Sequence, residues 1–132
     1  MYYYEKDYIM RLIHQTAIAL RRLLFGDEAE GDAAVLATLQ NTAIREESDY
    51  LRRLVDEGKI NAAEDRLFEL IESTAWDRQQ AAALVLAFYD DVNNRDDEFL
   101  AVAGFPRDEI ISGMEDAMRA IGMEIPEYLR IG

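Results

Sequence analysis

Cysteine is missing from this 132-residue chain, which excludes disulfides, thiolate zinc sites, iron–sulfur clusters and thiol catalysis. Proline and glycine are scarce, with two and seven residues, and this disfavours a chain of short strands joined by tight turns. The longest apolar run, residues 81–89, has nine residues, whereas a membrane-spanning helix needs about 20. The N-terminus lacks the basic and apolar regions of a secretory signal, so we expect a cytoplasmic protein.

Acidic side chains outnumber basic ones by 27 to 14, which gives a formal net charge of −13. The excess is uneven, because residues 1–26 carry +2 and the remainder carries −15. Such a field repels phosphate backbones and anionic lipid surfaces. We therefore expect neither a nucleic-acid partner nor a membrane partner.

Hydrophobic side chains recur every three to four residues along most of the chain, which is the period of an amphipathic helix. No segment alternates convincingly with a period of two. The prediction for residues 1–132 is therefore a single all-α domain of five to six antiparallel helices. The predicted helices span 7–25, 60–71, 78–93 and 106–122, with a short turn at 99–102 and a segment 32–57 that is one helix or two.

Residues with capping chemistry predict where these helices start and end. Glycine favours a left-handed C-terminal cap, and short polar side chains favour N-terminal caps. The predicted caps are Gly26, Asp32, Gly58, Asn61 with Glu64, Asp77 with Gln80, Asp96 and Gly122.

One spacing in the middle of the chain is informative: Leu54-x3-Gly58-x-Ile60-x2-Ala63-x3-Leu67-x2-Leu70. Over residues 44–73 it resembles the middle of a tetratricopeptide repeat, a 34-residue helix hairpin. Gly58 would allow the tight turn, and the small Ala63 would allow close helix contact. Thirty-four residues after Gly58 stands Val92, which departs from that pattern. Stacked hairpins of this kind and an orthogonal bundle therefore both stay open.

The opening stretch MYYYEKDYIMRLIHQ, together with this hairpin, resembles a family of small uncharacterised helical proteins from anaerobic bacteria. The resemblance implies a bacterial, all-helical protein and assigns no activity.

The residue patterns of common catalytic and metal sites are missing. The single histidine, His14, has Arg11 three residues before it, which excludes the paired Glu-x-x-His motifs of a di-iron bundle. The acidic stretch 90–98 fails as an EF-hand loop. In a loop that starts at Asp91, Arg95 occupies the fifth position, which needs an oxygen ligand, and Asp96 occupies the sixth, which needs glycine. We predict no enzymatic activity, no catalytic residue, no cofactor and no metal site.

Two arginines form the first candidate for partner binding. In the repeat register, Arg45 and Arg52 face the concave side of a hairpin array. Together they could hold a carboxylate of a bound peptide.

Apolar and aromatic residues near the N-terminus form the second candidate. Ile18 and Phe25 fall on the polar side of the first helix and indicate a further contact. Tyr3 and Tyr4 belong to an aromatic cluster, and such side chains are enriched at interfaces. These residues predict a homodimer.

Two functions remain open at this level. The leading prediction is a non-enzymatic, self-associating helical module that binds other proteins. The alternative is a helical bundle, with or without catalysis, that binds a small molecule or metal in a pocket containing carboxylates.

Overall fold

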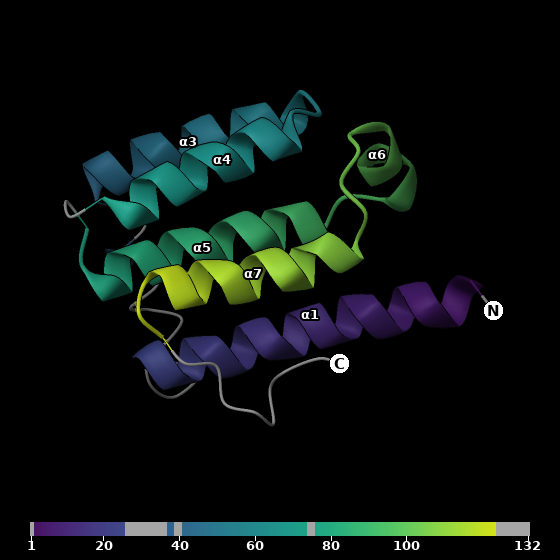
Figure 1. Ribbon diagram of the computed structural model, residues 1–132, viewed down its shortest axis with the longest axis horizontal. Helices are drawn as coiled ribbons and strands as arrows, with labels where there is room; N and C mark the ends of the chain where they lie inside the picture. Colours follow the sequence, from purple (N-terminus) through teal and green to yellow (C-terminus); the bar gives the residue numbers. More distant parts are fainter. Residues whose placement is uncertain (1, 26–36, 39–40, 74–75, 124–132) are drawn as a thin grey trace.

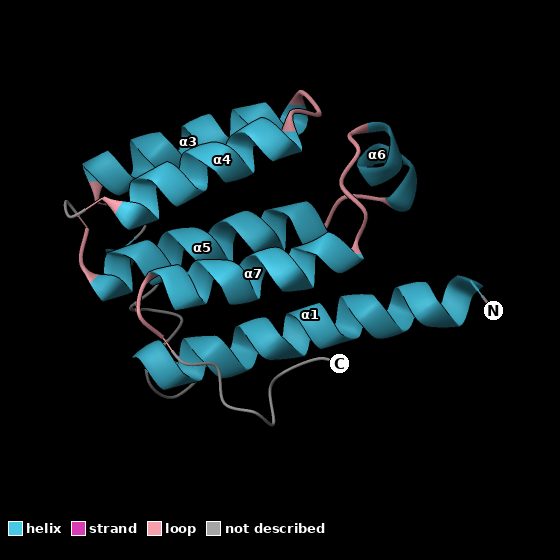
Figure 2. Ribbon diagram, in the orientation of Figure 1, coloured by secondary structure: helices cyan, strands magenta, loops and turns pink. Residues whose placement is uncertain are grey.

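The computed structural model describes residues 2–25, 37–38, 41–73 and 76–123, and within the first helix the side chains of residues 10–22. These parts contain helices and turns but no β-strand, which confirms the all-α fold class (Figure 2). The helices are α1 (Tyr2–Phe25), α3 (Thr42–Asp56), α4 (Ile60–Glu72), α5 (Arg78–Asn93), α6 (Asp97–Val102) and α7 (Asp108–Ala120).

The long helices stack in three layers (Figure 1). The α3–α4 hairpin forms the first layer, the antiparallel pair α5 and α7 forms the second, and α1 forms the third. Helix α5 contacts α1, α3, α4 and α7. Helix α1 runs antiparallel to α5, and the short α6 lies at one end of the stack, in the connection between α5 and α7.

Helix α5 is buried around most of its circumference, because it is apolar on nearly every side. Ten of its 16 residues are buried, and three of them are the consecutive alanines Ala81, Ala82 and Ala83. Because alanine extends little from the backbone, neighbouring helices can approach α5 closely from several directions. The central position of α5 therefore follows directly from its composition.

Two predicted N-terminal caps are confirmed. At the start of α5, Gln80 N donates to Asp77 Oδ1 at 2.8 Å and Asp77 N donates to Gln80 Oε1 at 3.0 Å, which completes a capping box. At the start of α6, Phe99 N donates to Asp96 Oδ1 at 2.8 Å. These bonds satisfy backbone N–H groups that have no partner within the first turn of a helix.

The segment 32–57 is interrupted at Asn41. This residue has an extended ψ of 130°, and its side chain accepts a hydrogen bond from Ala43 N at 3.2 Å. Asn41 is therefore the N-cap of α3 and not part of a continuous helix. The predicted caps Gly26 and Asp32 lie outside the described residues.

Two predicted helix starts are wrong. Helix α1 begins at Tyr2, five residues before the predicted start at Asp7, because no glycine or proline interrupts the intervening stretch. Helix α7 begins at Asp108, two residues after Pro106. The carbonyl of Pro106 instead accepts from Glu109 N at 2.9 Å, in a single turn that leads into α7.

The capping box predicted from Asn61 and Glu64 is also wrong. The N-cap of α4 is Lys59, which makes no capping bond through its side chain. Asn61 Nδ2 donates to the carbonyl of Gly104 at 3.4 Å, and the Glu64 carboxylate accepts a hydrogen bond from Tyr89. Both side chains thus contact segments more than 20 residues away in sequence, which the local pattern could not indicate.

Gly58 forms the turn of the α3–α4 hairpin, and its φ is +77°. Gly58 N donates to the carbonyl of Val55 at 2.9 Å and Lys59 N donates to that of Leu54 at 2.8 Å, the two bonds of a Schellman motif. A β-carbon at Gly58 would meet no atom within 4 Å. The left-handed backbone conformation, rather than a shortage of space, therefore requires the glycine.

Substituting alanine for Gly58 should lower the free energy of unfolding by about 1 kcal/mol, because alanine must adopt the left-handed conformation. Gly58→Asn is the matched control and should lose less, since asparagine tolerates that conformation better. Urea denaturation followed by circular dichroism measures both changes. An alanine variant as stable as the parent would show that the turn does not need a left-handed residue.

Candidate functional site

A groove of about 390 Å3 runs between α1, α3 and α5. Its lining combines small apolar side chains with both positive and negative charges. The lining residues are His14, Ala17, Ile18 and Arg21 from α1, Arg52 from α3, Leu86, Ala87, Asp90 and Asp91 from α5, and Asn94, the C-cap of α5.

Helical spacing on two antiparallel helices positions these side chains. On α1 the lining positions begin at His14 and recur three, four and seven residues later, so they share one face. On α5 they begin at Leu86 and extend over two turns to Asn94. Ala17 and Ala87 stand where larger side chains would fill the space, so the groove depends on these two alanines.

The groove continues toward α3 as a small recess of about 10 Å3, which is room for about one water molecule. Both depressions are lined by Arg52, Ala87 and Asp91. Ser48 of α3 lines the recess but not the groove. Arg52 therefore lies where the two depressions meet.

The charges of the groove are only partly balanced within the chain. Arg95 Nη2 donates to both oxygens of Asp91 at 3.1 Å and to Asp56 Oδ1 at 2.6 Å, so the charge of Asp91 is compensated. Within the described parts of the chain, the side chains of Arg52 and Asp90 form no hydrogen bond or ion pair. The groove thus presents one cation and one anion that are available to a ligand.

The sequence-predicted partner residues do not all meet at this groove. Ile18 and Arg52 both line it. Arg45 is exposed on α3 but is not among the lining residues, so the structure does not pair it with Arg52 there. The side chains of Tyr3, Tyr4 and Phe25 lie outside the described ones.

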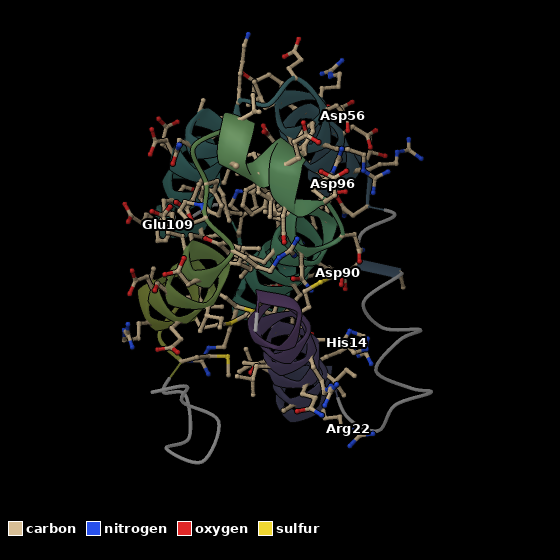
Figure 3. All side chains as sticks on the ribbon, turned by 90° about the vertical axis from the view of Figure 1, so that its right-hand side faces the viewer. His14, Arg22, Asp56, Asp90, Asp96 and Glu109 are labelled. Atoms are coloured by element: carbon tan, nitrogen blue, oxygen red, sulfur yellow. The ribbon has the colours of Figure 1, made fainter. Side chains whose placement is uncertain are left out.

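The contribution of α5 to the groove is not among the predictions from the sequence, which treat residues 90–98 only as an acidic stretch. The four-residue spacing of Asp90 and the C-cap Asn94 places both on one face at the end of α5, and this spacing is visible in the sequence. The sequence does not show which helix lies opposite that face. Figure 3 shows His14 of α1 and Asp90 of α5 on the same side of the molecule, with Glu109 on the other.

The acidic stretch after α5 serves the structure through Arg107, a residue only 8% exposed. The Arg107 guanidinium donates to Asp97 Oδ1 at 2.9 Å, and to the carbonyls of Asn93 and Arg95 at 2.7 Å each. A buried guanidinium needs such acceptors because losing its hydration is costly. Asp96 caps α6, so neither Asp96 nor Asp97 needs a metal ion to explain its position.

No group of three or more histidine, aspartate or glutamate side chains in the described residues could hold a metal ion. Among the described helices, none is both long and apolar enough to cross a membrane.

A half-buried carboxyl group lies between α4, α5 and α7. Tyr89, fully buried in α5, donates from its hydroxyl to Glu64 Oε2 at 2.7 Å. On α7, a β-carbon at Gly113 would overlap Glu64 Oε2 and would lie 2.7 Å from the Tyr89 hydroxyl. The pair therefore fits only because position 113 has no side chain.

The environment of this pair shifts both of its pKa values. Burial is the main cause that raises the pKa of Glu64 above its ordinary value of 4.5; the carboxylates of Glu109, Asp65 and Asp116 raise it further, and the Tyr89 hydrogen bond opposes the shift. Burial, together with the Glu64 carboxylate, also raises the pKa of the Tyr89 hydroxyl far above its usual range. Tyr89 therefore remains a hydrogen-bond donor at any physiological pH.

The raised pKa of Glu64 predicts a pH-dependent stability. The folded protein binds this proton more tightly than the unfolded chain, so stability is lost as the pH rises from 4.5 through the folded-state pKa. Glu64→Gln has no proton to release there, so its free energy of unfolding, relative to the parent, should be higher at pH 7 than at pH 4.

Urea denaturation at the two pH values measures this difference. The matched control is Glu72→Gln, an exposed substitution on the same helix, for which the difference should change less. A difference for Glu64→Gln that is the same at both pH values would contradict the raised pKa.

Comparison with known families places this chain. Residues 3–122 match the model of DUF6483, a family of unknown function. The chain belongs to this family. No curated protein and no solved structure gives a significant match to it. The groove between α1, α3 and α5 and its charged residues are therefore the features of this DUF6483 protein that bear on its function.

Proposed function

We propose that this DUF6483 protein is a non-enzymatic helical module that binds a segment of another protein in the groove between α1, α3 and α5. The observation that supports this function best is the groove itself. It combines a floor of small and aliphatic side chains with the unpaired charges of Arg52 and Asp90. Apolar contact with a few polar anchors is the usual composition of a recognition site.

The exposure of the lining favours a protein segment over a small molecule. His14, Arg52, Asp90 and Asn94 are all exposed, and only Leu86 among the lining residues is buried. Pockets for small molecules usually bury most of the ligand surface. An open groove instead suits an extended or helical segment that covers it from outside.

The stacking of the helices supports a relationship in build to tetratricopeptide arrays. The α3–α4 and α5–α7 hairpins stack so that α3 contacts α5 and α4 contacts α7, as successive repeats do. The groove lies along the first helices of both hairpins. Helix α1 covers the second hairpin but runs antiparallel to α5, so it acts as a cap and not as part of a third repeat.

The charges on the outer face of the α3–α4 hairpin support the view that this hairpin is the terminal repeat of the stack. It bears a second depression of about 610 Å3, lined by Glu46, Glu47, Tyr50, Ala62, Asp65, Arg66 and Glu69. Arg66 donates to Glu47 Oε1 at 2.9 Å and to Glu69 Oε2 at 3.2 Å. A face with this many charges is typical of a terminal repeat.

Small-molecule binding is the second candidate function, favoured by the volume of the groove and by the carboxylates of Asp90 and Asp91. A thermal-shift screen across chemical classes tests it, because a ligand that binds only the folded protein raises its melting temperature. A compound that stabilises the parent but not Ala87→Trp would support this second candidate instead of the protein segment.

Filling the groove should abolish peptide binding. A random peptide library displayed on phage, selected on the immobilised protein, should yield binders that Ala87→Trp no longer retains, because the indole occupies the floor. Ala62→Trp, which fills the outer depression on α3–α4, is the matched control and should retain them. Thermal melting checks that both variants are folded.

The proposal fails if selection yields no binder, or if the folded Ala87→Trp variant binds the selected peptides as well as the parent.

We also propose that the chain forms a homodimer, as its N-terminal aromatic cluster suggests. In the described parts, Tyr50 and Val102 are the only exposed large hydrophobic side chains. Tyr50 lies on α3 and Val102 on α6, so these two side chains do not form one apolar patch. The candidates for the dimer interface are therefore Tyr3, Tyr4 and Phe25.

Gel filtration with light scattering should therefore show a dimer, and Tyr3→Ser with Tyr4→Ser should shift it toward the monomer. A parent chain that stays monomeric at high concentration would exclude self-association.

A further inference from the structure

We propose that the groove selects a dipolar segment, which carries one acidic side chain, one basic side chain and one branched aliphatic side chain. This inference rests on the proposed function, because it specifies the chemistry of the segment that the groove binds. Three features carry it: the unpaired side chain of Arg52, the unpaired side chain of Asp90 and the aliphatic residues that line the same groove.

Arg52 is unusual for a chain with 27 acidic side chains and a net charge of −13. Three other described arginines with concave or buried surroundings have carboxylate partners: Arg66 binds Glu47, Arg95 binds Asp91, and Arg107 binds Asp97. Arg52 lines the groove without any such partner. A carboxylate on the bound segment would supply the missing interaction at this wall.

Asp90 is the corresponding anion on the wall formed by α5. Its neighbour Asp91 is already bound to Arg95, whereas Asp90 is exposed and forms no ion pair with a described residue. A lysine or arginine of the bound segment would supply the opposite charge. Because Arg52 and Asp90 come from α3 and α5, the segment must carry its two charges at separate positions.

The aliphatic lining of the groove specifies the remaining part of the segment. Ala17 and Ile18 of α1 and Leu86 and Ala87 of α5 present aliphatic surface. The two alanines leave room for a branched aliphatic side chain such as leucine. A polar side chain bound here would lose its hydration, and none of these four side chains could form a hydrogen bond with it in return.

Segments of a single charge sign are disfavoured. An acidic segment meets Asp90 and the net charge of −13, whereas a basic segment meets Arg52. Each unfavourable contact lowers affinity for such competitors, so the paired charges provide specificity as well as attraction.

Charge reversal in both partners tests this inference. The peptides selected from the phage library on the parent protein are synthesised, and their affinities are measured by fluorescence polarisation. We expect the peptides to share an acidic residue, an aliphatic residue and a basic residue. Arg52→Glu and Asp90→Lys should each weaken binding by about tenfold, while the control Arg45→Glu, on α3 but outside the groove, should not.

Peptides with one charge reversed should regain affinity for the matching variant. Replacing the acidic residue of a selected peptide by lysine should restore binding to Arg52→Glu and weaken binding to the parent. Replacing its basic residue by glutamate should do the same for Asp90→Lys. Circular dichroism confirms that the variants are folded, as expected for substitutions at exposed positions.

The outcomes separate this inference from the proposed function. If Ala87→Trp abolishes binding but Arg52→Glu and Asp90→Lys do not change it, the groove binds a protein segment and the dipolar selection is wrong. Selected peptides without the two charges would also overturn the inference. If Ala87→Trp binds as the parent does, both proposals fail.

Discussion

The burial of α5 on several faces at once is the constraint on which the other helices depend. A helix with a single apolar stripe needs one neighbour, but α5 is covered by α1, α3, α4 and α7. Its buried alanines allow these helices to come close, and Leu84, Val85 and Phe88 fill the space between them. The three layers of the molecule are the result, because α5 must have helices both above and below it.

So many contacts with one helix leave little room for polar groups, and two buried ones beside α5 have specific partners. The Tyr89 hydroxyl meets the Glu64 carboxylate only because Gly113 leaves space on α7. The Arg107 guanidinium is surrounded by the acceptors at the end of α5. Since an unsatisfied buried polar group costs about 1–3 kcal/mol, these contacts also fix how α4, α6 and α7 sit against α5.

The groove is a further consequence of the same packing. Helices α1 and α3 both pack against α5, and where they flank it the lining carries small side chains, Ala17 and Ala87. The charged lining residues Arg52 and Asp90 remain exposed. The structure therefore places aliphatic side chains and unpaired opposite charges in one groove, and the proposed binding of a protein segment rests on this arrangement.

The amino-acid pattern predicts the helices and several of their ends, since their period, the caps at Asp77 and Asp96 and the glycine turn at Gly58 depend on neighbouring residues alone. Helix packing, by contrast, brings Glu64 to Tyr89 instead of leaving it to cap α4. It also places Arg52 in one groove with Asp90, and Arg45 outside that groove. These outcomes depend on which helices become neighbours, and a periodic pattern specifies the face that each helix buries but not the helix that covers it.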